Sequence, residues 1–182
     1  MISHLKFYNI IISFTSFFFY FFMTNSIRIV IVGDSYVGKT SLLYRFNHRD
    51  ICSNHEPAIV EFSSQTVTYN NQQLELYLWN TSGSENISPL RGMYCNGANA
   101  ILLCFNICEP ASLENITRIW IPEIRGYSSC NNFLLVGLKK DLRNDENTIQ
   151  ELSDRGLKPV STKQGIKKAK EKPNNAHETV WK

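Results

Sequence analysis

The sequence lacks several features that would place it in other classes of protein. Its 182 residues carry a net charge of only +3, which is too small to indicate a nucleic-acid-binding surface. Its five cysteines show no paired, metal-binding spacing, and we expect them to be reduced and structural, as in a cytosolic protein. The last of them is Cys130, so a C-terminal prenylation site is not expected.

What is present is a globular composition, with 43% apolar and 19% charged residues. We expect one domain over residues 23–182, preceded by an extension over residues 1–22. From Ile10 to Met23 the chain is almost wholly apolar and rich in Phe. This run could be a membrane anchor, a signal-peptide core, or sequence upstream of a true start at Met23. We expect a cytoplasmic protein, with membrane association through this segment as the alternative.

The run GDSYVGKT fits the pattern G-x-x-x-x-G-K-[ST], between an apolar strand candidate (Ile27 to Val32) and a helix candidate (Ser41 to Phe46). A glycine loop between a strand and a helix N-terminus binds phosphate, because backbone N–H groups and the helix dipole face the anion. The lysine adds a positive charge, and the threonine hydroxyl is a candidate Mg²⁺ ligand. The candidate nucleotide-binding residues are Gly33, Asp34, Ser35, Tyr36, Val37, Gly38, Lys39, Thr40 and Ser41, with Thr40 also the metal ligand.

The rest of the chain alternates strand and helix patterns, which predicts a mostly parallel α/β sheet with flanking helices and with ligands at the carboxyl ends of its strands. A helix is predicted from Ser112 to Tyr127, with a kink at Pro122 and with an apolar stripe formed by Leu113, Ile116, Ile119 and Trp120. The predicted strands are Ser63 to Tyr69, Gln73 to Asn80, Ala98 to Phe105 and Phe133 to Gly137. A last helix is predicted from Gln164 to Lys172, where the lysines are read as a solvated face.

Two further segments follow strands: NTSGSE, from Asn80, and LKKD, from Leu138. With the phosphate loop they resemble, in order and spacing, the D-x-x-G and [NT]-K-x-D boxes of small GTPases. The carboxylate of Asp141 can accept two hydrogen bonds from guanine, and the stem of Lys139 can lie over the base. The resemblance implies a P-loop G-domain, GTP or GDP with Mg²⁺, and a contact from Gly83 to the γ-phosphate.

The segment from Asp145 to Gly165 resembles the helical insert of Rho-family GTPases. The run from Ala111 to Asn115, followed by Trp120, is also similar to Rho-family sequences. Ser35 and the TSGS run are similar to the Rnd subgroup, whose members bind GTP but barely hydrolyse it. The resemblance covers roughly Ile27 to Lys172.

The site departs from the family pattern. Ala58 replaces the Mg²⁺-binding Thr of the first switch, although its N–H remains available to the nucleotide. Asn80 replaces the Asp of the D-x-x-G box, and a neutral amide is a poorer partner for a hard cation. Ser84 replaces the Gln that orients the attacking water, so weak or absent hydrolysis is predicted and no catalytic residue is assigned.

The base site and the end of the fold depart as well. Ile51 stands where a Phe packs against guanine, and Leu138 replaces the Asn or Thr of the base box. The loop that seals the base and the final helix are not recognisable, and His177 to Trp181 resembles the start of a last strand. The fold is therefore expected to lack part of its last strand and helix.

Two functions from different classes follow. The first is a monomeric Rho-like switch that binds effectors, and exchange factors, through Glu56–Gln65 and Glu85–Tyr94. The second is a pseudo-GTPase, an interaction module that keeps the fold without the nucleotide. By family analogy, actin-linked signalling is the expected context.

Overall fold

The computed structural model describes residues 26–48, 59–69 and 71–171. Its strands form one sheet in the order β2-β3-β1-β4-β5, with β2 antiparallel to β3 and the other neighbours parallel. This arrangement confirms the predicted mostly parallel α/β fold. The strands are β1 (Ser26–Val32), β2 (Val60–Tyr69), β3 (Gln72–Thr81), β4 (Ala100–Asn106) and β5 (Phe133–Leu138).

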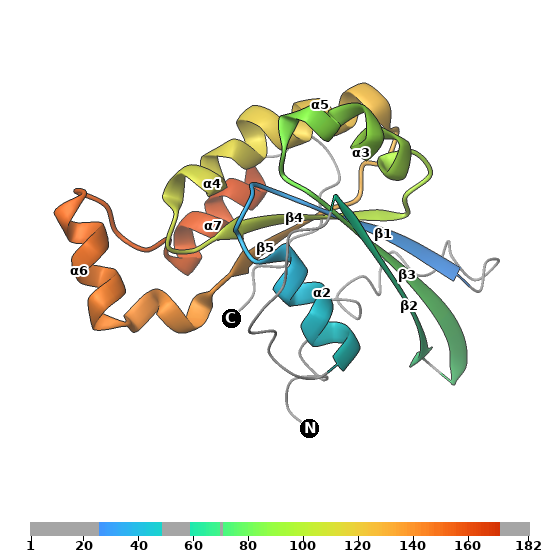
Figure 1. Cartoon of the computed structure of the whole chain (residues 1–182), viewed down its shortest axis with the longest axis horizontal. Coiled ribbons are helices and arrows are strands. Elements are labelled where there is room, and N and C mark those ends of the chain that lie inside the picture. The colour runs from blue at the N-terminus through green and yellow to red at the C-terminus, as the bar shows by residue number, and fades with distance from the viewer. Residues whose placement is uncertain (1–25, 49–58, 70, 172–182) are drawn as a thin grey trace.

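Helices cover both faces of the sheet, as Figure 1 shows. Helix α2 lies against one face, and the helices from α3 to α5, together with α7, lie against the other. The helical segments are α2 (Lys39–His48), η2 (Glu85–Ile87), α3 (Ser88–Cys95), α4 (Pro110–Asn115), η3 (Ile116–Trp120), α5 (Ile121–Tyr127), η4 (Lys140–Asn144), α6 (Glu146–Asp154) and α7 (Thr162–Lys170).

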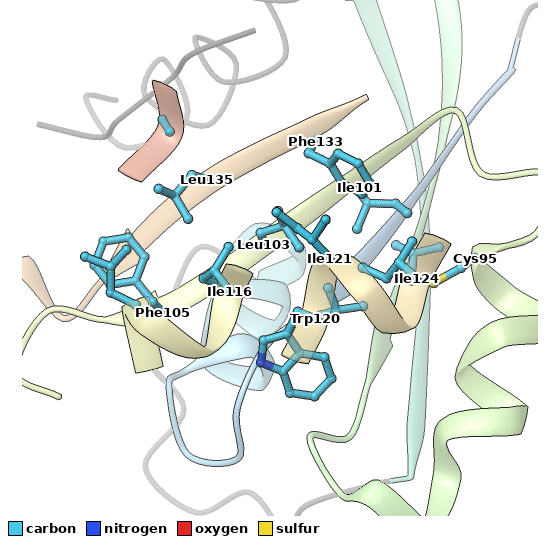
Figure 2. Packing of buried hydrophobic residues seen from close by; sticks show 14 of the residues in the cluster. Cys95, Ile101, Leu103, Phe105, Ile116, Trp120, Ile121, Ile124, Phe133 and Leu135 are labelled. Carbon is cyan, nitrogen blue, oxygen red and sulfur yellow. The ribbon is translucent and has the colours of Figure 1, made fainter. Parts of the chain in front are cut away.

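The side-chain period of two along the strands divides the core into two clusters. Alternate residues of β1, such as Ile29 and Ile31, face Leu43 and Phe46 of α2. The intervening residues, Val30 and Val32, face the other helices. Figure 2 shows that second cluster, in which Ile116, Trp120, Ile121 and Ile124 of the helical layer meet Ile101, Leu103 and Phe105 of β4 and Phe133 and Leu135 of β5. Strand β4 is buried on both faces, which explains its continuous apolar run.

The predicted helix from Ser112 to Tyr127 is not a single α-helix. It consists of α4, a π-helical turn (η3) and α5. Pro122 has no N–H to donate, and the π-helical turn ends just before the first turn of α5 that holds it. Of the predicted stripe, Leu113, Ile116 and Trp120 are buried, whereas Ile119 is half-buried.

Helix α7 also departs from the prediction. It begins at Thr162, two residues early, because Ser161 and Gln164 form a capping box. Its lysines are not all on a solvated face. Lys168 is buried, and its ammonium group donates to Glu114 of α4 at 2.5 Å and lies 3.3 Å from the Glu171 carboxylate.

Several sequence-based predictions fall on residues that the structure does not describe. These are the extension over residues 1–22, Ile51, Ala58 with the first part of Glu56–Gln65, and the strand candidate at His177. Of the five cysteines, Cys95, Cys104, Cys108 and Cys130 are described, and all four are free thiols. No described helix has the length and apolar character needed to cross a membrane.

Candidate nucleotide site

The phosphate loop connects the end of β1 to the start of α2, as predicted. Gly33 has a φ of +146°, and a Cβ at this position would lie 2.1 Å from the carbonyl oxygen of Cys104 in β4. Only glycine fits this close backbone approach. The loop is therefore anchored against the central strand.

Lys39 is the most buried polar group of the loop, with 6% of its surface exposed. Its Nζ donates hydrogen bonds to the carbonyl oxygens of Gly33 at 2.8 Å and Asp34 at 2.7 Å. Burial lowers the pKa of Lys39 to about 8, partly offset by neighbouring acidic groups. An ammonium group has three donors, so one N–H remains for an anion after these two bonds.

Asp34 is tied to the helical layer on the far side of the loop. Its carboxylate accepts hydrogen bonds from Asn115 Nδ2 and from Trp120 Nε1, each at 2.7 Å. The side chain thus points to the helices, and only the backbone of Asp34 remains for phosphate. The sequence analysis identified Trp120 as part of an apolar stripe and as a family-like residue, but nothing in the sequence indicates its hydrogen bond to Asp34.

The turn after β3 packs directly on the phosphate loop. A Cβ on Gly83 would lie 2.3 Å from Ser35 N and 2.6 Å from the Asp34 carbonyl carbon, so this contact also requires glycine. The structure therefore brings together two segments that are almost fifty residues apart in the sequence. Gly83 therefore lies next to the phosphate loop, which is where the predicted contact with the γ-phosphate requires it to be.

Arg91, in α3, fixes the turn after β3 through hydrogen bonds to its backbone. Its guanidinium donates to the carbonyl oxygens of Ser82 at 2.9 Å and Ser84 at 2.6 Å. It also pairs with Glu123 and lies 4.7 Å from the centre of the Trp120 ring. Arg91 is fully buried, and sequence reasoning missed it because a lone arginine in a polar segment gives no signal.

The candidate Mg²⁺ ligand, Thr40, lies in the first turn of α2. Its Oγ1 accepts a hydrogen bond from Asn80 Nδ2 at 3.0 Å, and the same nitrogen donates to Glu61 Oε2 at 2.5 Å. The other amide atom, Asn80 Oδ1, is buried without a hydrogen-bond partner among the described residues. Glu61 is a further residue at the site that sequence reasoning did not single out, although it lies within the predicted first switch.

The base-box residues lie at the end of β5. A Cβ on Gly38 would lie 3.6 Å from Leu138 Cδ1 and 4.0 Å from Lys139 Cε, so this box borders the end of the phosphate loop. Lys139 has a left-handed backbone (φ 59°), and both Lys139 and Asp141 are exposed. The candidate phosphate-binding and base-binding residues therefore lie close together, at the carboxyl ends of β1 and β5.

The remaining predicted residues of the loop differ in exposure, and Val37 can contribute only through its backbone. The side chain of Val37 is 2% exposed and belongs to the core. Tyr36 has a left-handed backbone and a side chain that is 84% exposed. Ser35 and Ser41 are exposed, and Ala58 lies outside the described residues. Among the described residues there is no cluster of three His, Cys, Asp or Glu side chains that could hold a metal alone.

The sheet order, the phosphate loop and the base box at one edge together define a P-loop domain of the small-GTPase class. Comparison with known proteins agrees: a sequence model of the Ras family matches residues 28–180. The GTP-binding protein rho4 of Schizosaccharomyces pombe is 40% identical over 139 residues, which cover 75% of this chain and 68% of that protein. The Rho-related GTP-binding protein RhoE of Homo sapiens is 38% identical over 144 residues, or 79% of this chain.

The chain therefore belongs to the Ras family and, within it, to the Rho family of small GTPases, with Rnd-like features. The matched segment spans 59% of the length of RhoE.

Proposed function

We propose that this chain binds a guanine nucleotide and acts as a Rho-like molecular switch that hydrolyses GTP slowly or not at all. The observation that carries the proposal is the position of Lys39. Its ammonium group is buried at the N-terminus of α2 and fixed by the Gly33 and Asp34 carbonyls. A buried positive charge beside a helix N-terminus favours an anion, and phosphate is the anion that the pattern predicts.

Phosphate binding would use the backbone N–H groups of the Gly33–Ser41 segment and the ammonium group of Lys39. The base would lie against Lys139, with Asp141 accepting hydrogen bonds from its N1 and N2 groups. This placement is supported by the position of Leu138 and Lys139 next to Gly38, because it brings the base-binding residues to the phosphate loop. Gly83 would contact the γ-phosphate from the opposite side of the loop.

The residues present also fit a Mg²⁺ ion, which would neutralise phosphate charge when bound. The Thr40 oxygen has two lone pairs, so the bond from Asn80 leaves one for the metal. The buried Asn80 Oδ1, which has no described partner, is suited to accept from a water molecule. Because the protein offers so few oxygen ligands, the phosphates would supply most of the coordination.

The proposal of slow GTP hydrolysis rests on the short side chain of Ser84. Its backbone is held by Arg91 and by the Ser82 hydroxyl, which accepts from Ser84 N at 3.2 Å. The side chain carries a single carbon before its hydroxyl, which is too short to orient a water molecule for attack on the γ-phosphate.

Partner proteins would contact the surface formed by β2 and α3, within the segments Glu56–Gln65 and Glu85–Tyr94. Ile59 is 60% exposed and Met93 is 72% exposed, so apolar side chains are available there. Methionine is enriched in protein–protein interfaces relative to the rest of the protein surface. Effectors and exchange factors are the expected partners, and the domain is expected to be a monomer.

The first experiment measures the nucleotide released when the purified full-length chain is denatured. Stoichiometric GTP supports a loaded switch with little hydrolysis. GDP alone would contradict the proposed role of Ser84, and absence of nucleotide from a folded protein would favour the pseudo-GTPase.

A second experiment tests hydrolysis directly. Ser84→Gln is expected to raise single-turnover GTP hydrolysis by at least about tenfold, because a longer amide can orient water. Ser84→Ala is the matched control and should leave the rate unchanged. Equal rates in the two variants would show that another group limits the reaction.

A further inference from the structure

The hydrogen bonds of Asn80 join three elements at the candidate metal position. Nδ2 of Asn80, near the end of β3, donates to Thr40 of α2 and to Glu61 of β2. Asn80 is 4% exposed, so these bonds lie in a protected environment where they are strong. One amide group thus connects the phosphate-loop helix to the strand that continues the first switch.

The orientation of this amide is determined by its neighbours. An ionised carboxylate only accepts hydrogen bonds, so the Asn80 atom that faces Glu61 must be the nitrogen. The pairing of Glu61 with Asn80 in the β2–β3 register keeps the two side chains together. The N–H bonds therefore direct partial positive charge at both a hydroxyl and a carboxylate.

The amide places partial positive charge between the oxygen atoms of Thr40 and Glu61. A divalent cation that bridges two oxygen ligands places its charge in the same way. We propose that the Asn80 amide replaces the bridging role of Mg²⁺ in this chain, so that nucleotide retention and stability depend little on the ion. This inference rests on the proposed nucleotide binding. Bound Mg²⁺ remains compatible with the site, but it is not required to hold Thr40 and β2 together.

The substitution Asn80→Asp tests the proposal by removing the amide that is proposed to replace Mg²⁺. It replaces the donating nitrogen with a charged oxygen at hydrogen-bond distance from the Glu61 carboxylate. Two carboxylates this close repel each other, and a divalent cation relieves the repulsion. The variant should therefore acquire a dependence on Mg²⁺, and adding Glu61→Gln should remove most of it.

The experiment compares release of a fluorescent GDP analogue from the full-length chain in millimolar Mg²⁺ and in excess chelator. In the unmodified chain, chelation should accelerate release by less than about fivefold, the lower end of typical coupling between two ligands. In N80D the acceleration should exceed about tenfold, and in N80D/E61Q it should return towards that of the unmodified chain. Acceleration above fivefold in the unmodified chain overturns the proposal, as does an N80D ratio no larger than the unmodified one.

Thermal unfolding with and without Mg²⁺ is the second measurement, and it requires no bound nucleotide. The midpoint of the unmodified chain should be unchanged by Mg²⁺, whereas that of N80D should rise, since a ligand that binds only the native state stabilises it. If no variant binds the GDP analogue, the proposed function fails, and these midpoints still decide the role of Asn80. If N80D does not fold, the chelation and midpoint results of the unmodified chain decide it.

Discussion

The two ends of the candidate nucleotide site are built differently. At the phosphate end, Lys39 is buried and held by two carbonyl oxygens, and Gly33 is pressed against β4. At the base end, Lys139 and Asp141 are exposed on a short helical turn. Substitutions at the first end should therefore affect both folding and binding, whereas those at the second should affect base recognition alone.

The strongest test of the phosphate end is Gly33→Ala. The added methyl group overlaps the Cys104 carbonyl and the backbone has a positive φ, so the free energy of unfolding should fall by about 4 kcal/mol. Denaturant titration measures this change. Gly156→Ala is the matched control: its φ is also positive, but no atom lies within 4 Å of the new Cβ, so about 1 kcal/mol is expected. Equal losses would show that the contact with β4 is unimportant.

The next largest effect is expected for Lys39→Met. Loss of the buried charge should weaken GDP binding by about a hundredfold, or about 3 kcal/mol. Stability should fall by less than in Gly33→Ala, because the ammonium group is costly to bury, which lowers its pKa to about 8, and this cost partly offsets the loss of its two hydrogen bonds. Equilibrium binding and denaturant titration measure the two quantities. Lys139→Met, at the exposed end, should weaken binding by less than about tenfold, and a larger loss would contradict the comparison.

The base end is tested with Asp141→Asn. The carboxylate can accept from both N1 and N2 of guanine, so GDP should bind the unmodified chain about tenfold more tightly than inosine diphosphate, which lacks the N2 amine. The variant should lose this preference while its unfolding free energy stays the same, because Asp141 is exposed. Retained preference for GDP would assign guanine recognition to another residue.

The smallest effect is expected at a position remote from both ends. The hydroxyl of Ser161 caps α7 by accepting a hydrogen bond from Gln164 N at 3.2 Å, and Ser161→Ala removes this cap. The free energy of unfolding should decrease by about 1 kcal/mol, with GDP affinity unchanged. A change in affinity would show that α7 is coupled to the nucleotide site.

Much of the fold could be predicted from local patterns. The strand pattern from Gln73 to Asn80 and the apolar run of β4 predicted these strands within a few residues. Alternating apolar residues fit a strand with one buried face, and a continuous apolar run fits a strand with two. The helix boundaries were less predictable. The π-helical turn at Ile116–Trp120 and the early start of α7 depend on hydrogen bonds that residue periodicity does not describe.

At the site, the pattern of the phosphate loop was sufficient to identify Lys39 and Thr40, since this chemistry requires fixed residue types at fixed spacing. The residues that support them were not predictable. Arg91 and Glu61 act through carbonyl and amide partners that lie 7 to 19 positions away. Trp120 reaches Asp34 across 86 positions.

The sequence by itself therefore determined the family, the phosphate loop and the losses at Ala58, Asn80 and Ser84. Those conclusions depend on residue identity and short-range spacing alone. The tertiary structure decided which groups each polar side chain meets: Asp34 turns to the helical layer, and Asn80 joins Thr40 to Glu61. The physical reason is that hydrogen bonds act over about 3 Å, and only the folded chain brings distant residues that close.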